Sequence, residues 1–173
     1  MKISLRRYAI LILFFPFYCL AQNPSETLST EELANLQSQG TKKLQDFYDY
    51  LDILSNPAYE NEMRSNAKES ANKVFYTNNC TIDGKMAKKY IDSCFNLKNR
   101  LKWRVIAVEV KENMKLKVSV LDNEYYEGLV TFKISSGTDT IANKRAFIVL
   151  EESKRQTASI KKGDWVPYVG DIR

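Results

Sequence analysis

Residues 101–110 read Leu-Lys-Trp-Arg-Val-Ile-Ala-Val-Glu-Val, and this stretch decides the fold. Up to Val105, apolar side chains alternate with Lys102 and Arg104, which is the period of a strand with one buried face. From residue 106 to residue 110 the run is apolar on both faces, which is typical of a central strand. The chain before this stretch has a helical period and the chain after it alternates. The change of period near residue 100 therefore divides the protein into a helical half and a stranded half.

The residues before 100 predict helices. Ser29, with Glu32 three residues later, forms a capping box, so a helix begins there, and Gly40 interrupts or ends it. A helical stripe resumes after this glycine, and a second helix begins with Asn56 as its cap and Pro57 in its first turn. The apolar positions of these helices, and of a short helix after a turn at residues 83–84, are Leu44, Phe47, Tyr48, Leu51 and Leu54; Met63, Ala67, Ala71, Val74 and Phe75; and Met86, Ala87, Tyr90, Ile91 and Cys94.

Short alternating runs after residue 110 predict further strands, separated by turns at residues 112–113 and 122–123. We expect these strands at residues 114–120, 126–134, 145–151 and 165–172. Pro167 would confine the last one to an edge of the sheet. Helices followed by strands give an α+β fold, in which the N-terminal helices pack on one face of an antiparallel sheet of four or five strands.

The first 21 residues predict a secretory signal. Lys2, Arg6 and Arg7 precede an apolar run over residues 8–21, which is shorter than the ~20 residues that span a bilayer as a helix. We expect cleavage after Ala21; the alternatives are an uncleaved membrane anchor and a lipid attached to Cys19.

Cleavage would leave a polar N-terminal segment and short helix at residues 22–40, and a single α+β domain at residues 41–173. The protein is then expected to be exported, either to the periplasm or to the extracellular space. Only the signal would involve the membrane.

Composition excludes several functions. The chain has 26 Lys and Arg residues, 21 Asp and Glu residues and no histidine, so it cannot build a Ser-His-Asp triad, a Cys-His pair or a histidine-based zinc site by itself. Three of the cations lie in the predicted signal, and the small net charge that is left gives no ground for nucleic-acid binding. Six scattered glycines form no phosphate-binding loop, and we expect no metal and no cofactor.

Two cysteines, Cys80 and Cys94, follow the predicted signal. A cysteine pair in an exported protein predicts a structural disulfide between them. Two free buried thiols are the alternative.

The order of elements resembles the nuclear-transport-factor and ketosteroid-isomerase superfamily, the cone-shaped cystatin-like α+β fold, over residues 41–173. The resemblance also rests on three stretches: Val74-Phe75-Tyr76-Thr77-Asn78-Asn79 closing a helix, Tyr126-Glu127-Gly128-Leu129-Val130-Thr131-Phe132 in a middle strand, and Trp165 before Gly170-Asp171-Ile172. It implies a curved sheet wrapped on a long helix, with a pocket at the open end. Its members include isomerases, dehydratases, transport adaptors and exported binding proteins. The inhibitory Gln-x-Val-x-Gly stretch of cystatins is absent.

Our leading hypothesis is a non-catalytic binding or interaction module that holds a small apolar ligand or a protein partner between the helices and the sheet. Such pockets are lined by aromatic and apolar side chains. The candidates for this lining are Phe47, Leu51, Trp103, Tyr126, Phe132, Phe147 and Trp165.

Two alternatives stay open. One is a small isomerase- or dehydratase-like enzyme, because the resemblance implies a carboxylate base and a tyrosine hydroxyl. The residue types are present in Glu109, Glu127, Glu151, Tyr48, Tyr90, Tyr125 and Tyr126, but no motif assigns a role to any of them, so we name no catalytic residue. The other is an envelope structural component that pairs with a copy of itself as a homodimer.

Overall fold

A computed structural model of the chain describes residues 28–97, 99–120, 123–137, 141–153 and 164–173. The predicted signal at residues 1–21 and the polar residues 22–27 after it lie outside the described residues. The helices are α1 (Thr30–Ser55), α2 (Asn61–Lys73) and α3 (Ala87–Phe95). The strands are β1 (Thr81–Ile82), β2 (Lys85–Met86), β3 (Arg104–Val118), β4 (Glu124–Ser135), β5 (Ile141–Ser153) and β6 (Asp164–Ile172).

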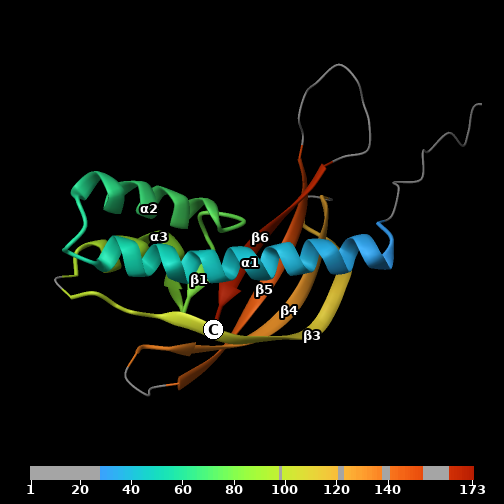
Figure 1. Cartoon of the computed structure of the whole chain (residues 1–173). Helices are drawn as coiled ribbons and strands as arrows, with labels where there is room; N and C mark the ends of the chain where they lie inside the picture. The colour runs from blue at the N-terminus through green and yellow to red at the C-terminus, as the bar shows by residue number, and fades with distance from the viewer. Residues whose placement is uncertain (1–27, 98, 121–122, 138–140, 154–163) are drawn as a thin grey trace, which may run out of the picture.

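The predicted α+β class is confirmed. The strands form one sheet of six in the order β2-β1-β6-β5-β4-β3, in which the β1–β6 pair is parallel and the other pairs are antiparallel. Figure 1 shows α1 lying across the hollow of the curved sheet, with α2 and α3 beside one half of it. No helix within the described ranges is both long and apolar enough to cross a membrane.

One helix, α1, positions the whole of this arrangement. The predicted capping box is confirmed, because the Ser29 side chain accepts a hydrogen bond from the Glu32 backbone and the Glu32 side chain accepts from the Ser29 backbone. The predicted break at Gly40 is wrong. A Cβ atom at this position would lie 2.2 Å from Cγ2 of Ile148 and 3.5 Å from Cβ of Pro167. Glycine stands there because the helix touches the sheet, and a continuous helix results.

A second contact fixes α1 against β3. The Gln37 side chain is 4% exposed, and its Nε2 donates a hydrogen bond of 2.9 Å to the backbone oxygen of Glu112. Gly128 leaves room for this amide, since a Cβ atom there would lie 2.7 Å from Nε2. The register between β3 and β4 is irregular on both sides of Glu112, as in a bulge. The turn predicted at residues 112–113 is therefore wrong, and β3 runs through it as one strand of 15 residues.

The position of β3 also differs from the sequence prediction. Residues 106–110 were expected in a central strand, yet among the described strands β3 pairs only with β4 and lies at the edge of the sheet. Ile106 is 53% exposed and Val110 is 49% exposed. An apolar run on both faces thus marks an uncovered edge here.

The segments that connect the helices and strands differ in part from the sequence prediction. The second helix begins at Asn61, because Asn56 caps the C-terminus of α1 and its side chain accepts a hydrogen bond from the backbone of Ala58. The turn at residues 83–84 is confirmed, and it joins β1 to β2. Met63 and Met86, which were expected to face inward, are 46% and 39% exposed.

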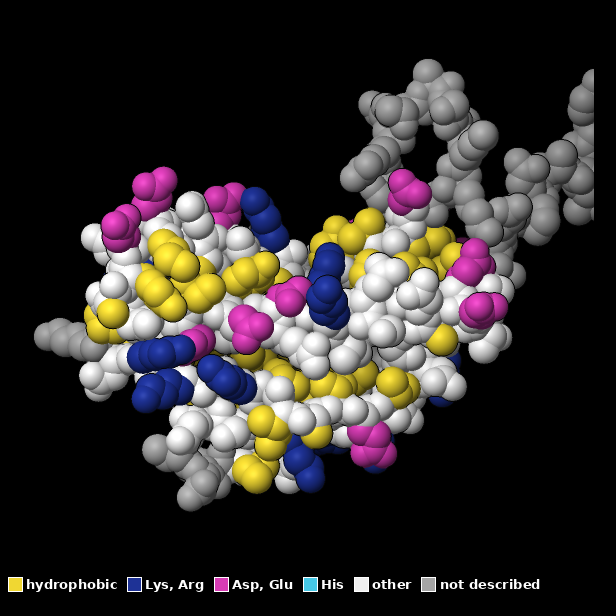
Figure 2. Space-filling model, in the orientation of Figure 1, with side chains coloured by type: hydrophobic (Ala, Val, Ile, Leu, Met, Phe, Trp, Pro, Cys, Tyr) yellow, Lys and Arg dark blue, Asp and Glu magenta, His cyan; other side chains and the backbone are white. Residues whose placement is uncertain are grey.

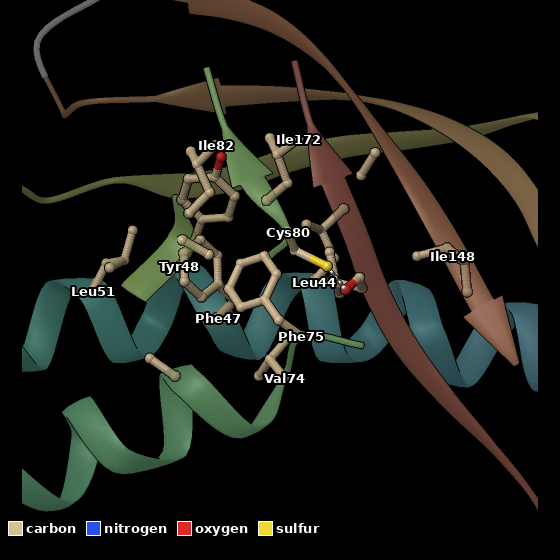
Figure 3. Close-up of a cluster of buried hydrophobic side chains, with 14 of the residues drawn as sticks. Leu44, Phe47, Tyr48, Leu51, Val74, Phe75, Cys80, Ile82, Ile148 and Ile172 are labelled. Carbon is tan, nitrogen blue, oxygen red and sulfur yellow. Dashed lines mark hydrogen bonds between the residues drawn. The ribbon is translucent and has the colours of Figure 1, made fainter. Parts of the chain in front are cut away.

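The core lies between α1 and the sheet. In Figure 3, Leu44, Phe47, Tyr48 and Leu51 of α1 meet side chains from β1, β5, β6 and the segment after α2. The Phe47 ring packs edge-on against Phe75, with 5.0 Å between ring centroids. These contacts leave the side chains at the centre of the core with almost no exposure to solvent.

The predicted disulfide is wrong: Cys80 and Cys94 are both free and buried. Each sulfur has its own partners. Cys80 Sγ lies 3.6 Å from the Thr77 hydroxyl, whereas the Cys94 thiol forms hydrogen bonds with the side chains of Ser93 and Tyr90. Burial also raises the pKa of Cys94, which keeps it in the unreactive thiol form.

We predict that Gly40→Ala destabilises the protein, although alanine is normally the better helix former. Overpacking against Ile148 should lower the free energy of unfolding by about 1–3 kcal/mol in urea titrations. In the double variant with Ile148→Ala the loss should be smaller than the sum of the two single losses, because the clashing methyl is removed. Ser38→Ala, an exposed change in the same helix, is the control; a more stable Gly40→Ala variant would contradict the close contact.

The free thiols give a second prediction. In a Cys19→Ser background, the midpoint of unfolding should be the same with and without reductant, because no disulfide constrains the unfolded chain. A reagent that labels free thiols should react slowly with the native protein, because both thiols are buried. It should react at once with two thiols per chain in the unfolded protein. A lower midpoint on reduction would show that the two sulfurs are bonded.

Candidate functional site

The structure places the seven predicted pocket residues in three environments. Phe47, Leu51, Tyr126 and Phe132 are at most 5% exposed and belong to the core. Trp103 and Trp165 are half-buried at its margin, where the Trp165 ring packs edge-on against Tyr126 at 5.0 Å. Phe147 lies on the opposite face of the sheet, since it alternates in β5 with the core residues Ala146 and Ile148. The seven side chains are therefore not brought together around one space.

The candidate catalytic groups are also dispersed. The Glu109 and Glu151 side chains are exposed, and Glu109 forms an ion pair of 2.6 Å with Lys111. Burial raises the pKa of Tyr48, and it raises the pKa of Tyr90 to about 12.

The carboxylate that acts on both tyrosines is Asp83, which is itself ion-paired with Lys144. None of the three candidate glutamates contributes to either pKa. Within the described part of the chain, no three His, Cys, Asp or Glu side chains are grouped so that they could hold a metal ion.

An open groove lies on the face of the sheet that α1 does not cover, with a volume of about 620 Å³. The strand register explains its shape. Ala107, Lys133 and Asn143 are neighbours across β3, β4 and β5, and in the next row Thr131 lies beside Arg145. Short side chains therefore alternate with long charged ones, which makes the surface hollow. The cations of the lining outnumber its one carboxylate, Glu109, so the groove is positively charged.

Two arginines face each other at the edge of this groove. The backbone nitrogen of Arg145 donates to the oxygen of Arg173 at 2.7 Å, and the nitrogen of Arg173 donates to the oxygen of Arg145 at 2.8 Å. The side chains of directly opposed residues lie on the same face of a sheet, and like charges in such a pair are destabilising. The sheet therefore holds two positively charged residues directly opposite each other.

The carboxylates near these groups compensate them only in part. Glu109 lines the groove opposite Thr131, but it forms an ion pair of 2.6 Å with Lys111. The Arg173 guanidinium lies 3.4 Å from the Asp171 carboxylate and 5.8 Å from the centre of the Phe147 ring. Lys133 and Arg145 form no ion pair with any residue that the structure describes. We name Lys133, Arg145 and Arg173, with Thr131 and Asn143 between them, the cationic groove.

A second, smaller recess of about 370 Å³ lies where β3 begins, and its cations are Arg100, Lys102 and Arg104. Figure 2 shows Lys and Arg side chains gathered in this region, close to acidic ones. Arg100 binds Asp52 through two nitrogens, and this hydrogen bonding lowers the pKa of Asp52. Arg100 therefore fastens this loop to α1 and is not free to bind a ligand.

Comparison with protein-family models gives no match for the chain, and comparison with curated proteins gives none either. The residues of the cationic groove were not among the sequence-predicted site residues. Lys133 and Arg145 could be assigned to outward positions of their strands from the alternation alone. That the two strands are neighbours, and that Arg173 pairs with Arg145, depends on the topology.

Proposed function

We propose that the protein is an exported, non-catalytic binding module that takes an oxyanion-bearing ligand, a carboxylate or a phosphate, in the cationic groove. The observation that carries this proposal is the opposed pair of Arg145 and Arg173 beside Lys133, which has no ion-pair partner among the described residues. Like charges held directly opposite each other cost stability, and such local conflicts are typical of functional sites.

The chemistry of the groove suits such a ligand. A guanidinium presents several N–H donors in one plane and binds carboxylate or phosphate oxygens with two parallel hydrogen bonds. Asn143 adds an uncharged donor beside the cations, whereas the Thr131 hydroxyl donates to the backbone oxygen of Glu109 at 3.5 Å and keeps its lone pairs as acceptors. The volume of about 620 Å³ lies within the usual range for small-ligand sites. Because the groove is open to solvent, we expect binding that weakens as salt is added.

Other observations support a surface site over an interior one. Leu44, Phe47 and Leu51 are fully buried in the space where the apolar pocket was expected. The dispersal of the candidate carboxylates and tyrosines speaks against an isomerase- or dehydratase-like reaction. Export rests on the leader sequence, and membership of the nuclear-transport-factor-like superfamily rests on element order and the curved sheet around α1.

Calorimetric titration with inorganic phosphate and with succinate tests the proposal and distinguishes the two oxyanions. At low salt we expect saturable binding of at least one of them. Arg145→Gln should weaken it about tenfold, which corresponds to the loss of one charge-assisted interaction of ~1.5 kcal/mol. The same substitution should leave the unfolding free energy equal or raise it by about 0.2–1 kcal/mol, because it removes a like-charge pair.

Lys73→Gln is the matched control, since Lys73 is an exposed cation on α2 whose partner is Glu69. It should leave the affinity unchanged. If Lys73→Gln and Arg145→Gln lost equal amounts of affinity, the loss would come from the lower net charge and not from the groove. Titrations without heat of binding for either anion, together with saturable binding of an apolar probe, would instead support the interior pocket.

A further inference from the structure

The edge strand β3 leaves apolar side chains uncovered. Val110, Leu116 and Val118 are 49%, 43% and 62% exposed, although the residues opposite the first two, Val130 and Tyr126, are buried in the core. Figure 2 shows a band of hydrophobic surface beneath α1 in this region. Only β4 pairs with β3 among the described strands, so one side of its backbone has no strand beside it.

The other face of β3 carries an ordered pattern of charge. Glu109, Glu112, Lys115 and Lys117 lie opposite residues 131, 129, 127 and 125 of β4. Those partners are every second residue of a regular strand, so the four charges are evenly spaced on one face. The bulges of β3 take up its extra residues. In this spacing, two acidic positions are followed by two basic ones.

This pattern is complementary to itself when one strand is reversed. If a second copy pairs antiparallel about a two-fold axis between Glu112 and Lys115, Glu112 lies opposite Lys115 of the second copy. Glu109 then lies opposite Lys117 of the second copy. By the same register, Val110 of one copy meets Leu116 of the other on the opposite face. Any other registration of the four charges places at least one like-charged pair together or leaves charges unmatched.

We propose that two copies of the chain associate through β3 in this register and join their sheets into one. Edge strands are usually protected from such pairing by lysines and by bulges. Here each lysine of the pattern has an acidic counterpart in the second copy, so the same charges that repel a foreign strand select a copy of this one. The bulge between Glu112 and Lys115, where the Glu112 oxygen turns inward to Gln37, lies at the axis and separates two arms of pairing.

The association would satisfy the backbone groups of a free edge and cover the exposed valines and leucine. It uses the sheet edge, and Glu109 is the one residue of the charge pattern that also lines the groove. Lys115 and Lys117 do not line it, so substitutions at these two positions test the association separately from the proposed ligand. The existing ion pairs of these side chains are Glu109 with Lys111 at 2.6 Å, Glu112 with Lys115 at 3.7 Å and Lys117 with Glu127 at 3.9 Å. They lie at the surface, where ion pairs contribute little, so they are weak competitors.

Sedimentation velocity of protein produced from the full-length sequence, together with charge-swapped variants, tests this pairing. We expect a concentration-dependent dimer for the natural sequence up to ~100 μM. The double variant Lys115→Glu, Lys117→Glu makes the pattern wholly acidic, and Glu109→Lys, Glu112→Lys makes it wholly basic. Each should dissociate at least tenfold more readily than the natural protein. Mixing the two should restore the dimer, and so should the fourfold variant that carries all four changes.

All four positions are exposed, so the variants are expected to keep the fold, and equal unfolding midpoints would verify this. Lys73→Glu is the control for a change of net charge elsewhere. Residues 1–27 are the same in every variant. If the chains associated through those residues, the charge substitutions in β3 would not change the dissociation constant. The proposal is overturned if the natural protein is monomeric throughout the concentration range, or if mixing the oppositely charged variants fails to restore the dimer.

Discussion

The close approach of α1 to the sheet at Gly40 is the contact on which the rest of the structure depends. With no side chain at this position, the helix backbone meets Ile148 and Pro167 directly, and the apolar stripe of α1 reaches the floor of the curved sheet. The neighbouring turn of the helix is fixed on β3 in a similar way. The Gln37 side chain binds the Glu112 backbone oxygen, and Gly128 has no side chain that would occupy the same space. The space under the helix is filled as a result, and recognition is left to the outer surfaces of the sheet.

The sequence predicted the class of fold because its two periods are distinct and the order of helices and strands is unambiguous. It failed where one residue had two physical explanations. Gly40 reads locally as a helix breaker, yet it is required for packing against a strand more than one hundred residues later in the chain. The polar pair at residues 112–113 reads as a turn, yet it is a bulge whose oxygen is bound by Gln37. Local patterns do not contain these distant partners.

The candidate site was less accessible to sequence reasoning than the fold. Aromatic residues such as Phe47 and Phe132 were assigned to a pocket because aromatic side chains line both pockets and cores, and composition does not separate the two. Arg145 and Arg173 are 28 residues apart in the chain. They come together only because the backbone of β5 pairs with the residue that follows β6. To predict this pair from the sequence, one would have to know in advance which strands are neighbours in the sheet. The cysteine spacing suggested a bond, but each thiol has other partners in the fold.

The central claim is that this protein binds at the outer face of its sheet and not beneath α1. Chemical-shift mapping of the backbone amides during a titration with inorganic phosphate tests it most directly. The account predicts progressive shifts confined to the strands of the cationic groove, around Thr131, Lys133, Arg145 and Arg173, with the amides of α1 unchanged. Shifts centred on residues 44–54 of α1 and on the core positions of β4 would contradict it, because they would place the ligand in the interior.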